Sequence, residues 1–296
     1  DEINMVARAI AQEQALIYKT DQAREILANI EKETGEKPAF IYVSFTPQGY
    51  QPQSLEEDFA RREISNTEEY RQVEITKEGL SPQISPPPSP DDLLDILIIT
   101  QGKNPLRVVV PVTRQEVVTN ASNLWSKTAD AFNLGNDYKP FAAQMYEWLV
   151  KPISELLEEA EVTNLLFMMP PEIRFTPLAV LYDSETEKFL VEKYSSGLAP
   201  SLNLNDNRYR PIQDLSLLAM GASTFADNTV EPLPAVQIEV PTIQKIWAGE
   251  TSLDYKSYLN QNFTLEQIRS NLSRNPYGIV HFSTHGEFNY TDTLNS

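Results

Sequence analysis

Cysteine is absent from this sequence of 296 residues, and histidine occurs only twice. The absence of cysteine excludes disulfide bonds and thiolate metal ligands. Two histidines are too few for the common zinc sites, so we expect neither a metal nor another cofactor. Without cysteines, the sequence carries no signal for the redox compartment.

Basic residues are scarce, since 24 lysines and arginines stand against 42 aspartates and glutamates, a net charge of −18. Proteins that bind nucleic acid neutralise its phosphates with a surplus of basic side chains, and this chain has no such surplus. Nucleic acid is therefore not an expected partner. The acidic residues are spread along the chain, as in Glu56–Asp58, which is typical of solvated faces.

Long apolar runs are missing as well. No stretch approaches the length of about 20 apolar residues that a spanning helix needs, and Asp1–Glu2 does not begin a signal peptide. We therefore expect no membrane partner and a cytoplasmic location. Because the first residue is not Met, we also expect that the N-terminus is an internal cut and that the chain is a piece of a longer protein.

Apolar residues make up 41% of the chain, enough for a proper core, and their spacing predicts most elements of its first half. The spacing predicts one long helix or a helix pair in 3–30, a strand at 40–45, a hairpin of 93–100 and 107–112, and helices at 114–132 and 141–161. Pro152 should begin a new segment within the last of these helices or kink it.

The stretch from Gln51 to Pro90 is polar and ends in the Pro-rich run Ser85–Pro90. Such a composition buries too little surface to offset the entropy of ordering the chain. It predicts a mobile insertion that serves as a linker. A Pro-rich ligand for an aromatic-lined groove is the alternative.

The second half of the chain carries continuous apolar runs at Leu165–Met169, Leu215–Met220 and Ile279–Phe282. Runs of this kind, separated by helices, indicate parallel strands that are buried on both faces. Thr264 and Gln267 fit a capping box for a helix that ends before Asn275–Pro276. The pattern predicts an α/β fold.

Both histidines lie in or just after the last of these runs. If the strand stays regular, Ile279, His281, Ser283 and His285 point to one side. His285 then leaves the carboxyl end of a parallel strand, where α/β sheets place their ligand sites. Gly286 has no Cβ and can present its N–H to a developing oxyanion. A general base beside such a donor is half of an acyl-transfer site; ordinary polar residues at a strand end are the alternative.

Two weaker patterns lie nearby. Gly221–Thr224 follows a strand and could bind phosphate, but it lacks the glycine spacing and the lysine of a Walker motif. Ser223 and Ser283 could be proposed as nucleophiles, yet neither lies in a Gly-x-Ser-x-Gly motif.

Ile279–Gly286 reads Ile-Val-His-Phe-Ser-Thr-His-Gly. It resembles the His-Phe-(Ala/Ser)-Thr-His-Gly motif of CHAT domains, caspase-like domains that are often fused to TPR repeats in bacterial proteins. Five further segments lie upstream of it in the family's order: Leu165–Leu181, Phe189–Tyr194, Ala199–Leu202, Leu218–Gly221, and Leu233–Ala235 followed by Glu239–Val240. The resemblance runs from about Lys37, or at least Asp92, to Ser296. Two departures are Pro170–Glu172 in place of an Asp-Gly turn, and Pro241, which should interrupt the helix after Val240.

The resemblance implies a caspase-like α/β fold with a mostly parallel sheet and helices on both faces, preceded by an N-terminal helix and a smaller subdomain of a β-hairpin and helices. Three parts are expected. The first is an N-terminal helical segment at 1–36, which is a candidate end of a helical repeat region. The second is a β/α part at 37–160 with the mobile insertion at about 51–91. The third is a caspase-like part at 161–296, truncated after the strand that carries the histidines.

By the same resemblance, His285 corresponds to the catalytic histidine of a His/Cys pair and Gly286 to the residue whose amide lines the oxyanion hole. Caspase-type spacing puts the cysteine about 50 residues after the histidine. We therefore expect it beyond Ser296 and expect this segment alone to be inactive. Replacement of the cysteine within the remaining stretch is the less favoured alternative. His281 matches a residue common in the motif, for which we expect a structural role, with a contact to substrate as the alternative.

The resulting hypothesis is a large part of a cysteine endopeptidase that hydrolyses protein or peptide substrates, with a TPR region in the same parent chain as a further partner. The alternative is a non-catalytic caspase-like scaffold or sensor that mediates protein–protein interaction. It is motivated by the missing cysteine and the helical N-terminal side. The sequence does not specify a cleavage site.

Overall fold

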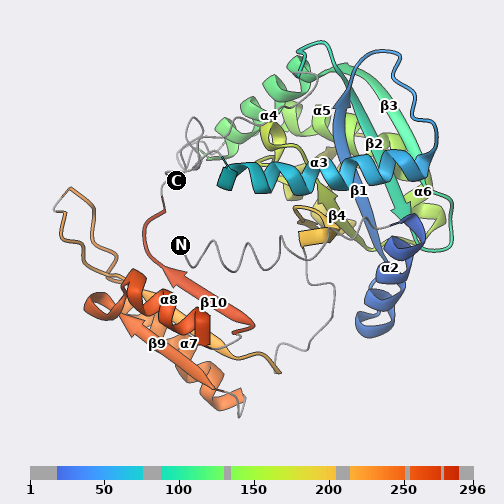
Figure 1. Cartoon of the computed structure of the whole chain (residues 1–296). Helices are drawn as coiled ribbons and strands as arrows, with labels where there is room; N and C mark the ends of the chain where they lie inside the picture. Colours follow the sequence, from blue (N-terminus) through green and yellow to red (C-terminus); the bar gives the residue numbers. More distant parts are fainter. Residues whose placement is uncertain are drawn as a thin grey trace. The chain divides into compact units, whose positions relative to one another are not determined.

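A computed structural model describes residues 19–75, 88–129, 135–204, 214–227, 229–250, 254–274 and 277–286 (Figure 1). The chain divides at residues 207 and 208 into two compact units. We call the described residues 19–204 the N-terminal unit and the described residues 214–286 the C-terminal unit. The three parts that the sequence predicts, with boundaries after residues 36 and 160, stay predictions.

The N-terminal unit is built on a five-stranded mixed sheet in the order β3-β2-β1-β4-β7. Its strands are β1 (Pro38–Thr46), β2 (Leu93–Thr100), β3 (Leu106–Thr113), β4 (Asn164–Met168) and β7 (Ser195–Leu198). β1 pairs antiparallel with β2 and parallel with β4. The predicted strand at 40–45 and the hairpin of β2 and β3 are confirmed. Gly102 adopts a φ of 75° in the hairpin turn, a left-handed conformation that glycine adopts without steric cost.

Helices cover both faces of this sheet. They are α2 (Thr20–Thr34), α3 (Leu55–Ile75), α4 (Arg114–Ala129), α5 (Lys139–Leu149) and α6 (Ser154–Glu159). Successive strand residues point to opposite faces. Ile41 and Val43 accordingly pack with α4, α5 and α6, and Phe40 and Tyr42 pack with α2 and α3. The predicted break at Pro152 is confirmed, because a 3₁₀ turn separates α5 from α6. The first part of the predicted N-terminal helix, 3–18, lies outside the described residues.

The prediction of a mobile insertion from residue 51 is wrong for 55–75, because α3 occupies these residues and packs over β1 and β2 (Figure 1). The buried positions of its first half are Asp58, Phe59, Arg62 and Glu63, which lie on one helical face. Three of these four side chains are charged, so apolar spacing did not reveal the helix. Ser54 caps it, since its Oγ accepts the Glu57 N–H at 3.1 Å. Residues 76–87 of the predicted insertion lie outside the described part of the chain.

The buried charged side chains of α3, which are Asp58, Arg62 and Glu63, each have a partner. Arg62 bonds Asp58 at 2.9 Å and pairs with Asp95 of β2 at 2.8 Å. Glu63 accepts the hydroxyl hydrogen of Tyr42 at 2.6 Å and the backbone N–H of Leu202 at 3.1 Å. Burial raises the pKa of the Glu63 carboxyl. α3 is therefore joined to the sheet by hydrogen bonds and ion pairs as well as by Phe59, which packs edge-on against Tyr42.

The C-terminal unit contains a three-stranded sheet, all parallel, in the order β10-β8-β9. Its elements in chain order are β8 (Leu217–Gly221), α7 (Val236–Glu250), β9 (Tyr255–Leu259), α8 (Leu265–Arg274) and β10 (Ile279–Ser283). Ser257 bonds Gln244 of α7, whereas its neighbour Lys256 bonds Asn271 of α8. Because neighbouring strand residues face opposite ways, the two helices lie on opposite faces. The predicted α/β fold with parallel strands and helices on both faces is confirmed.

Two local expectations for this unit are wrong. Pro241 lies inside α7, which continues to Glu250; proline at the sixth position deprives only one early carbonyl of its helical partner. β8 is buried throughout, but Val280 and Phe282 of β10 are 40% and 45% exposed. β8 is the central strand and β10 lies at the edge of the described sheet, so only the central strand is buried on both faces.

Candidate functional site

The candidate site lies at the carboxyl edge of the β10-β8-β9 sheet. Because the three strands are parallel, they end at the same edge, at Gly221, Leu259 and Ser283. The residues that follow them include Ser223, Asn260 and His285. Open α/β sheets bind ligands outside this edge. The sheet therefore gathers polar side chains from three separate segments where such a fold places its chemistry.

His285 lies two residues beyond the end of β10 and is exposed. Its Nε2 lies 2.6 Å from the backbone carbonyl oxygen of Glu231, and its ring lies 5.0 Å, between centroids, from the ring of Phe225. A carbonyl oxygen only accepts hydrogen bonds, so Nε2 must carry the hydrogen. In the neutral ring the lone pair is then on Nδ1. Nδ1 is the atom of His285 that can take a proton from a reacting group.

The regular alternation expected along the last strand holds only as far as Ser283, where β10 ends. His281 and Ser283 do share a side, since His281 Nε2 lies 2.8 Å from Ser283 Oγ. His285 is oriented instead by the segment between β8 and α7, through Phe225 and Glu231. A loop contact, rather than strand periodicity, sets its position.

His281 lies within β10 and contacts α7. Its Nε2 is 3.0 Å from Glu239 Oε1, and its side chain is 33% exposed. The contact ties the edge strand to the helix that covers one face of the sheet. This arrangement agrees with the structural role expected for His281, which remains a prediction.

The two serines that the sequence offered as alternative nucleophiles are both buried, with Ser223 1% and Ser283 6% exposed. The N–H and the Oγ of Ser223 both donate to Asn260 Oδ1, at 2.8 and 3.0 Å. These donors are therefore occupied, which leaves them unable to cradle a phosphate. The geometry favours neither a phosphate loop at Gly221–Thr224 nor a serine nucleophile.

Gly286 follows His285 and is exposed, and a Cβ built on it would meet no atom within 4 Å. Space beside its backbone is what close approach of a substrate carbonyl requires. Its backbone conformation does not demand glycine, because its φ lies outside the left-handed region.

We therefore expect Gly286→Ala to leave the free energy of unfolding within about 0.5 kcal/mol of the parent value, as for most surface substitutions. Urea denaturation followed by circular dichroism measures this. A larger loss would mean that Gly286 has a structural role, and the substitution would then be unsuitable as a probe of chemistry.

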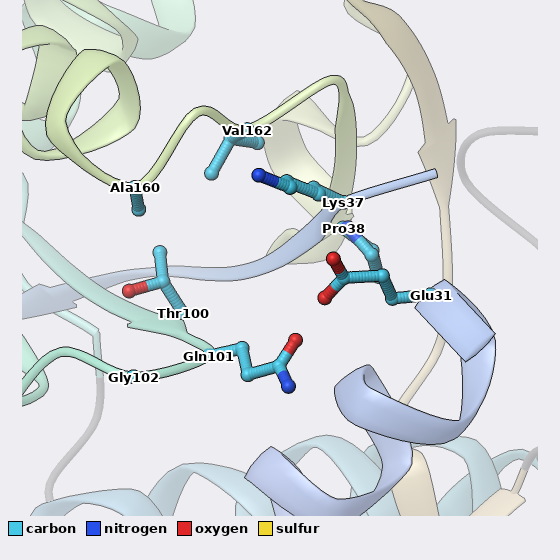
Figure 2. A pocket seen from close by; sticks show the side chains of 8 residues that line it. All are labelled: Glu31, Lys37, Pro38, Thr100, Gln101, Gly102, Ala160 and Val162. Atoms are coloured by element: carbon cyan, nitrogen blue, oxygen red, sulfur yellow. The ribbon is translucent and has the colours of Figure 1, made fainter. Parts of the chain in front are cut away.

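A separate cavity of about 290 Å³ lies in the N-terminal unit, at the amino ends of β1 and β4 (Figure 2). Figure 2 shows Glu31, Lys37 and Gln101 around it, and Lys37 forms an ion pair with Glu161. Parallel strands place their ligand sites at the opposite, carboxyl ends. We assign no role to this cavity.

In a comparison with protein families, residues 139–296 match the CHAT domain. The match covers more than half of the chain and includes β8, β10, His285 and Gly286. The chain belongs to the CHAT domain family. The resemblance read from the sequence is thereby confirmed from residue 139 onwards, and 37–138 lie outside the matched range. Comparison with curated proteins and with solved structures gives no match.

CHAT domains are associated with caspase-like cysteine peptidases, and the position of His285 in this CHAT domain suits a general base. In the part of the chain that the structure describes, no helix is long and apolar enough to cross a membrane. The same residues contain no group of three or more side chains placed to hold a metal ion.

Sequence reasoning did not find Phe225, Glu231 or Asn260. Glu231 acts through its backbone carbonyl, which any residue carries, so no residue type could have signalled it. Asn260 offers a weak signal, since it directly follows a strand at the functional edge and adopts a φ of 51°, a conformation that asparagine tolerates better than most residues.

Proposed function

We propose that this CHAT domain is the greater part of a cysteine endopeptidase, in which His285 is the general base and the nucleophilic cysteine is supplied from beyond residue 296. The observation that carries the proposal is the contact between His285 Nε2 and the carbonyl of Glu231. In the neutral ring it places the lone pair on Nδ1, which can accept a proton, on an exposed ring at the carboxyl edge of a parallel sheet. A protein or peptide is the proposed substrate, and a TPR region of the parent chain is a proposed further partner.

In this mechanism Nδ1 of His285 takes the proton of the thiol, and the thiolate attacks the carbonyl carbon of the scissile peptide bond. The carbonyl oxygen becomes an oxyanion that accepts a hydrogen bond from the Gly286 N–H. The imidazolium then gives its proton to the departing amine, which leaves a thioester. Water, deprotonated by Nδ1, hydrolyses the thioester and restores the thiol.

The edge position of β10 supports this arrangement. Within the described residues β10 pairs only with β8, so its outer edge has no described neighbour. A further parallel strand at that edge would end beside His285. A cysteine at its carboxyl end would lie at the same edge of the sheet as His285.

The test uses the longer parent chain and an electrophilic thiol probe at about pH 6.5. About 1% of an ordinary thiol is ionised there, so an activated cysteine should react roughly 10- to 100-fold faster than the same cysteine in the His285→Ala variant. His281→Gln is the matched control, because it changes the other histidine of the same strand and should keep the fast reaction. Absence of labelling, or labelling that is equally fast in the His285→Ala variant, would overturn the proposal.

The second candidate is a non-catalytic scaffold or sensor. It is favoured by the absence of cysteine from all 296 residues and by the apolar side chains that α7 exposes, Ile238 at 73% and Ile246 at 59%. A parent chain that carries a strand but no cysteine after His285 would support this candidate.

A further inference from the structure

Asn260 is the residue that joins the ends of two strands at the candidate site. It directly follows β9, and its Oδ1 accepts two hydrogen bonds from Ser223, which lies two residues beyond the end of β8. The donors are the Ser223 N–H at 2.8 Å and Oγ at 3.0 Å. One side-chain oxygen therefore fixes both the backbone and the side chain of Ser223.

Ser223 in turn closes the loop that connects β8 to α7. Its carbonyl accepts the Leu233 N–H at 3.0 Å, and its Oγ accepts a hydrogen bond from Gln237 Nε2 at 3.0 Å. Ser223 lies at the start of the loop, whereas Leu233 and Gln237 lie at its end and in the first turn of α7. At 1% exposure, Ser223 makes these bonds out of water, where losing a partner is costly.

The loop closed in this way carries two groups that, among the described residues, contact the His285 ring. Phe225 packs against the ring, and Glu231 accepts its Nε2–H. None of the hydrogen bonds described for Ser223 and Asn260 involves His285, so the pair acts on the ring indirectly. The path runs from Asn260 to Ser223, and from Ser223 through the loop to Phe225 and Glu231.

We propose that Asn260 and Ser223 are positioning residues, which hold the described residues of the loop between β8 and α7 so that Glu231 and Phe225 fix the orientation and the tautomer of His285. The catalytic meaning of this pair rests on the proposed function. The predicted tautomer of His285 does not rest on the proposed function, because it is a property of the folded chain whether or not a cysteine is present. Fixing the ring in one tautomer keeps Nδ1 as the basic nitrogen.

Substitutions of Asn260 can distinguish the effect of its side-chain acceptor, Oδ1, from the effect of its backbone conformation. Asn260→Gly tolerates the φ of 51° but removes Oδ1, which leaves the Ser223 donors without their acceptor. Asn260→Asp keeps an acceptor at the same position. Ser257→Ala is the control, since it breaks a bond of 2.6 Å between β9 and α7 that does not involve the loop.

The readout is the ¹⁵N spectrum of the histidine rings in the 296-residue chain at about pH 8.5, where an ordinary imidazole is neutral. The chain has two histidines, so the spectrum contains two rings, which His281→Gln assigns. We expect parent His285 to carry its hydrogen on Nε2, with two well-separated nitrogen signals. In Asn260→Gly these signals should converge as both tautomers become populated, whereas Asn260→Asp and Ser257→Ala should keep the parent pattern.

A parent-like pattern in folded Asn260→Gly would overturn the inference, as would convergence in Asn260→Asp equal to that in Asn260→Gly. If circular dichroism shows that Asn260→Gly does not fold, Ser223→Ala tests the same connection by removing Oγ alone. In the longer chain, kcat should fall about 10- to 100-fold in Asn260→Gly with little change in KM, and recover in Asn260→Asp. A longer chain without thiol-dependent activity would contradict the proposed function, and the ring spectrum would still decide this inference.

Discussion

Replacing Arg62 by Met should lower the free energy of unfolding of the N-terminal unit by about 3–5 kcal/mol, the cost of leaving buried charges without a partner. Arg62 is 2% exposed and lies between Asp58 and Asp95, which are both fully buried. It also bonds Ser44 Oγ at 2.8 Å. Met fills a similar volume and offers no donor, so two carboxylates lose an ion-pair partner together.

The remaining cations cannot replace Arg62 fully. Asp58 keeps Arg61, whose side chain is 39% exposed, and Asp95 keeps Arg107 at 2.7 Å. Urea denaturation measures the loss. Lys103→Met is the control, because it breaks an ion pair whose partners are 41% and 55% exposed and should cost less than about 1 kcal/mol. If Arg62→Met lowers the free energy of unfolding as little as Lys103→Met does, the stability of α3 does not depend on these buried charges.

Gly221→Ala should destabilise the C-terminal unit by about 1–3 kcal/mol, as overpacking in a tight core does. A Cβ at Gly221 would lie 2.6 Å from Val236 Cγ1 and 2.9 Å from the backbone oxygen of Ser283. The side chain of Val236 can turn away, but the backbone oxygen can move only with β10. Since His285 follows Ser283 by two residues, the substitution should also change the ring spectrum of His285.

Gly249→Ala is the matched control, since Gly249 lies in α7 and a Cβ there meets nothing within 4 Å. Alanine should stabilise the helix by roughly 0.5–1 kcal/mol, the opposite sign, because glycine loses more backbone entropy on folding. Urea denaturation compares the two variants. Equal effects would show that the contacts of Gly221 do not limit packing at this edge.

Four strands could be predicted from the sequence because they are buried as continuous apolar runs. β1, β2, β4 and β8 are of this kind, and each was found within a few residues of its bounds. α3 was missed because its inward face is charged and becomes compatible with a core only through partners on β1 and β2. Those pairings join residues far apart in the chain, and spacing along one segment does not reveal them.

The candidate site shows the same limit. His285 and Gly286 could be predicted from a local motif, since strand, histidine and glycine are neighbours in sequence. The groups that orient His285 come from a loop more than 50 residues earlier, and one of them is a backbone carbonyl. Ser223 was considered as a nucleophile because of its residue type. Its burial and its bonds to Asn260, which depend on the folded sheet, point instead to positioning.

The division of the chain at residues 207 and 208 also bears on how its stability is measured. Each unit has a hydrophobic core of its own, so unfolding need not be a single all-or-none transition. The tryptophans report on the two units separately, with Trp125 and Trp148 in α4 and α5 and Trp247 in α7. A melting temperature followed through one tryptophan describes one unit, and this chain is better characterised by two unfolding curves than by one.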